Sequence, residues 1–172
     1  MKIVVWAPEV TPHLTDTLVE LQKMTNEPLL YMTWEVTHKV RMEQGWSDYE
    51  KTGGLNVIEF NHKKWWRQGV DIINLHKNAI HIFIGFWTVR CYFIFILFGL
   101  YKKNKIAILN EPFSTGYFGY SGDDSIIINW IKVKLRPLLY HLAAFLIDIF
   151  SNNNPPCFLS ISLLAREQFL RS

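Results

Sequence analysis

The stretch KIAILNEPFS, residues 105–114, decides the fold of this chain. Its first half is a short apolar run that begins at a charged residue, which predicts a β-strand over residues 105–109. The strand ends at an amide, a carboxylate and a proline: Asn110, Glu111 and Pro112. In an open α/β fold, ligands bind in the crevice outside the carboxyl ends of parallel strands. The stretch therefore predicts both a strand and a polar site at its end.

The chain opens on the same pattern, in KIVVWAPEVTPH, residues 2–13. Its continuous apolar run predicts a strand over residues 2–7 that is buried on both faces and ends at Pro8. A helix is expected from about Pro12, with Thr11 as its N-cap and the proline in the first helical position.

Strands and helices alternate along the rest of the chain, which predicts a Rossmann-like parallel sheet with helices on both faces. The 172 residues are most simply one domain, residues 1–172. Pro137 lies inside one expected helix and should kink or divide it. Further strands are expected at residues 29–35, 55–60, 80–87, 105–109 and 158–162, helices at 62–77, 89–103, 126–148 and 163–171, and loops at 37–54 and 114–124.

The apolar run of residues 79–101 is long enough to suggest a membrane span. Arg90 lies in its middle, at a cost of roughly 2.5–3.5 kcal/mol on insertion scales. We therefore predict two buried elements there, a strand and then a helix. A membrane-anchored protein with a span at 79–101 is the alternative.

Composition excludes several classes of protein. Hydrophobic residues make up 49% of the chain, too many for a disordered protein. The net charge of +3, without a basic stripe interleaved with aromatics, gives no reason to expect nucleic acid. Cys91 and Cys157 are too few for a disulfide framework and favour reduced thiols. With no signal peptide expected, these features predict a cytoplasmic protein.

Four segments together resemble the N-terminal half of a bacterial GT-B glycosyltransferase of the family 4 type. They are KIVVWAPE, ILNEPFSTGYFGY, RPLLYHLAAFL and FLSISLLAREQFLR. In such enzymes two Rossmann-like domains face each other across a cleft; the N-terminal one mostly holds the acceptor and the C-terminal one the nucleotide sugar. The resemblance covers nearly the whole chain but half of such an enzyme, so it implies a truncation before the C-terminal domain.

The resemblance implies that a sugar is transferred from a nucleotide sugar to a sugar or lipid-linked acceptor, in polysaccharide biosynthesis. No cofactor and no metal are expected besides the donor substrate. Alone, the chain should be inactive or very weak. Two departures concern ligand contacts: the loop of residues 8–12 lacks the Gly-Gly pair of many members, and Asn110-Glu111 stands where many carry a His. A stand-alone α/β binding or regulatory domain is the alternative.

Glu111 is the candidate catalytic residue, as a base or as an acceptor of a hydrogen bond from a sugar hydroxyl. A solvated loop acid or a cap of the following turn is the alternative. Acceptor binding is assigned to Asn110, which is equally at home in a turn, and to Tyr117, an aromatic in the 114–124 loop that could stack on a sugar ring.

Glu9, Thr11 and His13 surround the first loop and are the other acceptor-binding candidates. The helix that begins near Pro12 offers free backbone N–H groups, which suit a phosphate. An ordinary capped helix start explains the same residues.

Basic residues suggest peripheral contact with the inner face of the cell membrane, since family 4 enzymes often use lipid-linked acceptors. A solvated basic face is the alternative. The residues are Lys102, Lys103, Lys105, Lys132, Lys134 and Arg136.

Overall fold

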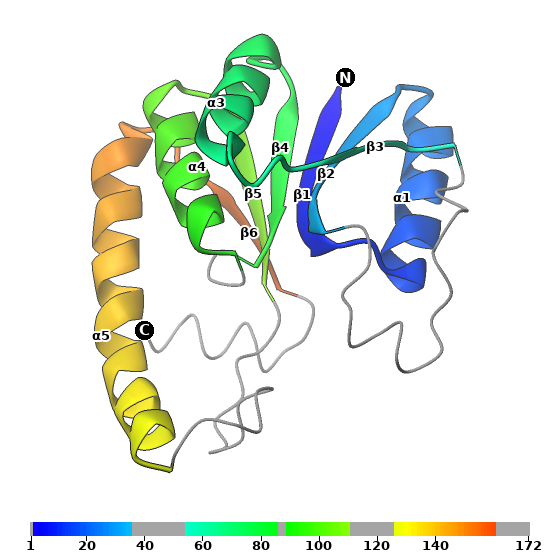
Figure 1. Cartoon of the computed structure of the whole chain (residues 1–172). Helices are drawn as coiled ribbons and strands as arrows, with labels where there is room; N and C mark the ends of the chain where they lie inside the picture. The colour runs from blue at the N-terminus through cyan, green and yellow to red at the C-terminus, as the bar shows by residue number, and fades with distance from the viewer. Residues whose placement is uncertain (1, 36–53, 86–88, 111–125, 161–172) are drawn as a thin grey trace.

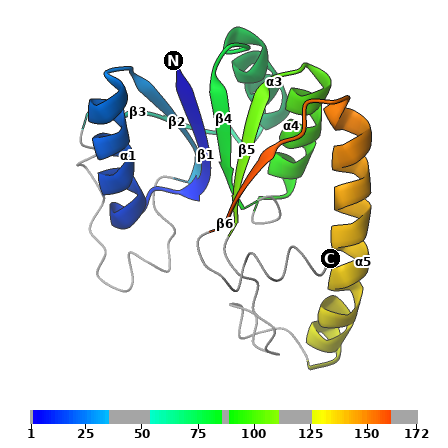
Figure 2. The same cartoon turned by 180° about the vertical axis from the view of Figure 1, so that it is seen from behind.

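The computed structural model describes residues 2–35, 54–85, 89–110 and 126–160. Within them six parallel strands form one sheet with helices on both faces (Figures 1 and 2), which confirms the predicted Rossmann-like α/β class. The elements are β1 (Ile3–Glu9), α1 (Pro12–Thr25), β2 (Leu29–Glu35), β3 (Asn56–Glu59), α3 (Trp65–Leu75), β4 (Ile80–Ile84), α4 (Arg90–Tyr101), β5 (Lys105–Asn110), α5 (Ile126–Ser151) and β6 (Cys157–Ser160).

The strands lie in the order β3-β2-β1-β4-β5-β6. The chain builds outward from β1 to β3 on one side, then returns to the middle and builds from β4 to β6 on the other. The order therefore reverses between β1 and β4. Open α/β sheets bind their ligands at such a switch point, outside the carboxyl ends of the strands.

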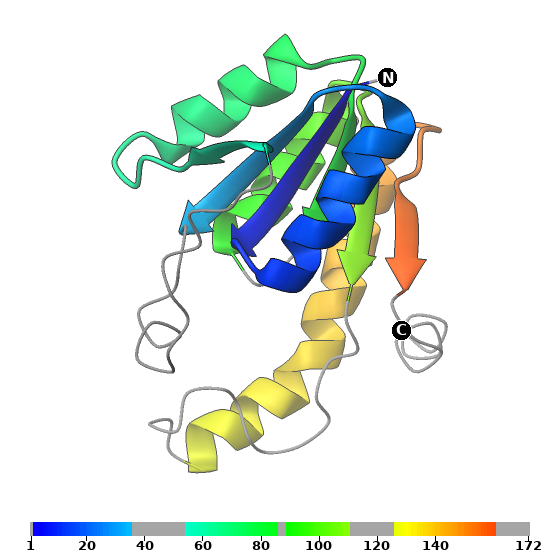
Figure 3. The ribbon, with the colours of Figure 1, turned by 90° about the vertical axis from the view of Figure 1, so that its right-hand side faces the viewer.

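Side chains of β1 are buried on both faces of the sheet. Val5 and Ala7 pack with residues of α1 on one face, whereas Val4 and Trp6 join the core with residues of α3 and α4 on the other. Figure 3 shows α1 on one side of the sheet and α3 and α4 on the other. Successive side chains of a strand point to opposite faces, so a central strand between two helical layers must be apolar throughout.

The larger core is built around the indole of Trp6. Its ring centroid lies 5.1 Å from that of Phe83 and 5.6 Å from that of Phe95. Phe95 in turn lies against Gly69 of α3, where an added Cβ would be 2.1 Å from the ring. The glycine therefore lets α3 and α4 approach closely over the sheet.

Several predicted boundaries were wrong. β1 does not end at Pro8 but continues to Glu9. It pairs with β4 only from Ile3 to Trp6, so the missing backbone N–H of Pro8 removes no hydrogen bond between β1 and β4. Pro137 does not divide its helix, since α5 is one helix from Ile126 to Ser151. Residues 37–53 of the expected 37–54 loop, the whole 114–124 loop and the last expected helix, 163–171, lie outside the described residues.

The apolar run of residues 79–101 holds β4 and α4, as two separate elements. α4 is apolar nearly all round because α3, α5 and the sheet surround it. Among the described residues, none of the helices combines the length and the apolar character that a membrane span requires. The structure therefore favours the two-element prediction over a span.

Candidate functional site

Polar residues end the strands on both sides of the switch point. Glu9 ends β1 opposite Glu35 at the end of β2, and Asn110 ends β5 opposite Ser160 at the end of β6. Because all six strands are parallel, these four positions share the carboxyl edge of the sheet. Carboxylate, amide and hydroxyl groups are hydrogen-bonding partners for a polar ligand.

The two central strands separate before they reach this edge. β1 pairs with β4 up to Trp6 opposite Phe83, but pairs with β2 as far as Glu9 opposite Glu35. Gly85 follows β4 with φ +68°, a conformation that suits glycine, and its N–H donates to the carbonyl of Leu109 at 2.8 Å. β4 thus turns toward β5 where β1 continues beside β2.

Two buried tyrosines hold the end of β1 from opposite faces of the sheet. The hydroxyl of Tyr31 donates to the carbonyl oxygen of Glu9 at 2.8 Å, and that of Tyr92 donates to the carbonyl oxygen of Ala7 at 2.5 Å. Burial raises the pKa of both phenols well above their usual range, and the nearby Glu9 adds to the rise for Tyr31. Both therefore remain protonated donors at neutral pH.

The corner from β1 to α1 is short and fixed. Val10 is buried between them, Thr11 is the N-cap in an extended conformation, and Pro12 begins the helix as predicted. Thr11 makes no side-chain capping bond, although its carbonyl accepts the N–H of Thr15 at 2.9 Å. The corner holds no glycine that would let a pyrophosphate approach the backbone closely.

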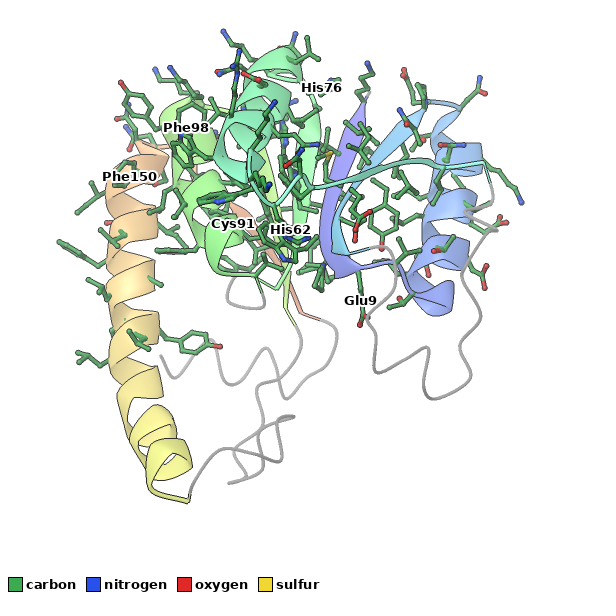
Figure 4. The ribbon with its side chains drawn as sticks, viewed as in Figure 1. Glu9, His62, His76, Cys91, Phe98 and Phe150 are labelled. Carbon is green, nitrogen blue, oxygen red and sulfur yellow. The ribbon has the colours of Figure 1, made fainter. Side chains whose placement is uncertain are left out.

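The structure brings some of the predicted site residues to one edge. Glu9 lies partly exposed at the carboxyl end of β1 (Figure 4), and Thr11 and His13 follow at the start of α1. Asn110 ends β5 at the same edge, but β4 lies between β5 and β1. The side chains of His13 and Asn110, and all of Glu111 and Tyr117, lie outside the described residues.

Sequence reasoning missed four contributors to this edge. The signal for Glu35 was present, because the 29–35 strand was expected to end at this residue and parallel strand ends share an edge. Ser160 was expected in the middle of the 158–162 strand. Tyr31 and Tyr92 gave no such signal: each lies in an apolar segment, and its partner is far away in the sequence.

The described residues hold no cluster of three or more metal-ligating side chains. His81 is fully buried, accepts the indole N–H of Trp6 at 3.2 Å and has its other ring nitrogen 3.1 Å from the carbonyl oxygen of His76. Burial lowers the pKa of His81 to about 4 and raises that of Cys91 to about 12. Both groups are therefore neutral parts of the core at physiological pH.

Comparison with known proteins identified no matching family model, no similar curated protein and no similar solved structure.

Proposed function

We propose that the carboxyl edge of this sheet binds the sugar acceptor of a GT-B glycosyltransferase of the family 4 type, in polysaccharide biosynthesis. The observation that carries the proposal is the row of polar strand ends beside the switch point, at Glu9, Glu35, Asn110 and Ser160. Carboxylate, amide and hydroxyl groups, the residue types at these positions, can accept hydrogen bonds from the several hydroxyls of a sugar.

The glycine-free corner, a departure from many family 4 members, disfavours the close approach of a phosphate to the backbone at this half of the cleft. Dinucleotide-binding sheets of the same strand order place glycines in their first corner, so that a phosphate can approach the backbone. Here Pro8 and Pro12 flank a buried Val10. In our proposal a second Rossmann-like domain holds the nucleotide sugar, whereas the domain described here presents the acceptor. The reaction takes place in the cytoplasm.

Within the proposal, the acceptor hydroxyl oxygen forms a bond to the anomeric carbon while the bond from that carbon to the nucleoside diphosphate breaks. Glu111, the residue after Asn110, accepts the hydroxyl proton. Glu9, Thr11, His13, Asn110 and Tyr117 orient the acceptor. The chain tested by itself is expected to transfer no sugar above background.

Titration of the ¹⁵N-labelled chain tests the binding half of this proposal. Maltose should shift the amide signals of Glu9, Glu35 and Asn110, and uridine diphosphate should not. Glu9→Gln should weaken maltose binding about tenfold, because hydrogen bonds to a charged group contribute about 1.5–3 kcal/mol. Glu20→Gln, an exposed acid of α1, is the matched control. Uridine diphosphate binding at this edge, without maltose binding, would contradict the proposal.

A further inference from the structure

One face of α5 is apolar and exposed. Four large side chains follow one another along it at spacings of four, three and four residues, and each is more than half exposed. We call them the α5 stripe: Leu138 (64%), Leu142 (51%), Phe145 (60%) and Ile149 (55%). These spacings are those of the a and d positions of a heptad, the seam along which one helix packs onto another.

The α5 stripe lies on the side of the helix that the fold leaves open. Ala143 and Ile147 are buried in the core shared with α4, and Tyr140 and Phe150 pack against it. Successive residues of a helix are about 100° apart, so these four side chains lie roughly 150° around α5 from the stripe. α5 is also the outermost helix of its layer (Figures 1 and 2). The stripe therefore faces away from the core.

The size of this surface suits a second copy of the chain. Leu139, beside the stripe, is 45% exposed. Together with the stripe it presents about 400–550 Å² of apolar surface, at roughly 150–200 Å² for a whole side chain of this size. Dimer interfaces are roughly 65% apolar, so an interface centred on the stripe would bury about 600–850 Å² on each copy. Stable interfaces bury about 800 Å² on each partner.

The α5 stripe is complementary to itself when two copies run antiparallel. A two-fold axis between Leu142 and Phe145 puts Leu142 of one copy beside Phe145 of the other. The same axis puts Leu138 of one copy beside Ile149 of the other. Each large side chain of the stripe therefore meets another large side chain.

The polar residues that flank the α5 stripe are complementary in the same arrangement. His141 and Asp148 are exposed one heptad apart, both at position g, and lie about 10 Å apart along the helix. The two-fold axis brings His141 of one copy near Asp148 of the other, and an imidazole N–H donates to a carboxylate in either charge state. In a parallel pair position g faces position e, so His141 would face Leu146 instead. The flanking residues therefore favour the antiparallel pair.

We propose that α5 is the interface of a two-fold symmetric dimer, in which the α5 helices of two copies of this chain pack antiparallel along the α5 stripe. Leu142 and Phe145 form the centre of the interface, and His141 and Asp148 set its direction. From the size of the surface we expect a Kd of about 1–10 μM, so the dilute chain is a monomer. The proposal stands on α5 alone and does not depend on the sugar site at the strand ends.

Sedimentation velocity of the whole chain tests the dimer. At about 100 μM the parent should sediment near twice its mass of 20.3 kDa, and at about 0.1 μM as a monomer. Leu142→Ser with Phe145→Ser should weaken the dimer at least about a hundredfold, because it removes the apolar centre from both copies. Its far-ultraviolet circular dichroism should match that of the parent, since both side chains are more than half exposed. Leu75→Ser, at an exposed apolar position of α3, is the matched control and should leave the Kd unchanged.

A charge exchange tests the antiparallel direction. His141→Glu should weaken the dimer about threefold to tenfold, because it places a carboxylate near Asp148 of the other copy in both symmetric contacts. Adding Asp148→Lys should recover most of the lost affinity, because opposite charges then face each other across the interface.

Three outcomes would overturn the proposal. The first is a parent chain that stays a monomer at about 100 μM, which would leave the α5 stripe to a partner other than a second copy. The second is a double serine variant that dimerises as the parent does. The third is a variant with both His141→Glu and Asp148→Lys that dimerises no more tightly than His141→Glu alone, because the two helices then do not pack antiparallel.

Discussion

α4 and α5 are neighbouring helices with apolar sequences, but they differ in how much of their apolar surface is buried. α4 lies between α3 and α5 over the sheet, and its Phe95 and Ile96 are fully buried. α5 lies outside α4, buries Ala143 and Ile147 on one face, and exposes Phe145 on the other. The position of a helix within its layer therefore decides how many of its apolar side chains are buried and stabilise the fold.

The largest expected effect compares one phenylalanine from each helix. Phe95→Ala should lower the free energy of unfolding by about 4 kcal/mol, because it leaves a cavity among the rings around Trp6. Phe145→Ala should change it by less than about 0.5 kcal/mol, since the ring is 60% exposed. Urea unfolding of both variants, with the chain dilute enough to be a monomer, measures the difference. Equal losses would show that α5 is covered as α4 is, and would break the comparison.

His81, which is buried in the core beneath α3 and α4, makes the free energy of unfolding dependent on pH. Its folded-state pKa of about 4 lies below the ordinary value of about 6.5, because the ring is buried. As pH falls below about 6.5 the unfolded chain takes up the proton first, so stability falls until about pH 4 and then levels off.

The His81 contribution to this loss is about 3 kcal/mol, at about 1.4 kcal/mol for each unit of pKa shift. His81→Gln removes the titrating group and keeps a polar side chain beside Trp6. The parent should therefore lose about 3 kcal/mol more than this variant between pH 7 and pH 4 in urea unfolding. Parallel pH profiles for the two proteins would show that His81 is not buried in its neutral form.

Gly69→Ala tests the close contact that brings α3 onto α4. The added methyl would meet the ring of Phe95, and neither helix backbone can yield freely, so we expect a loss of about 2 kcal/mol. Asn74→Ala, at an exposed position of the same helix, should be neutral or slightly stabilising. If Gly69→Ala also stabilises, helix propensity outweighs packing at this contact.

Much of the fold could be predicted from the sequence because its signals are local. Alternating apolar runs and helical segments gave the parallel sheet, and the Thr11-Pro12 pair gave the start of α1. Of the two outcomes expected for Pro137, division of the helix was wrong, because the packing of Ala143 and Ile147 on α4 favours one continuous α5. The sequence alone does not say which helix packs innermost.

The candidate site could be predicted only in part, because its support comes from distant residues. Glu9 and Asn110 were expected just after two apolar strands, and the structure places both positions at the carboxyl edge of the sheet; their binding roles stay predictions. The bonds from Tyr31 and Tyr92 to β1 span 22 and 85 residues of sequence, so no local pattern indicates them. The roles of Glu111 and Tyr117 stay predictions, outside the described residues.

The smallest expected effect concerns Tyr92, whose hydroxyl connects α4 to the end of β1 at the candidate site. Tyr92→Phe removes the hydroxyl that donates a hydrogen bond to the carbonyl oxygen of Ala7. Because this hydrogen bond is lost, the free energy of unfolding should fall by about 1 kcal/mol. Tyr101→Phe, on the exposed part of α4, should leave it unchanged. If Tyr92 positions the end of β1, its variant should also weaken maltose binding severalfold while Phe145→Ala does not. If Tyr92→Phe lowers stability but leaves maltose affinity unchanged, the core and the sugar site are independent. If Tyr92→Phe lowers both and Phe145→Ala lowers neither, α4 positions the site and the outer face of α5 does not.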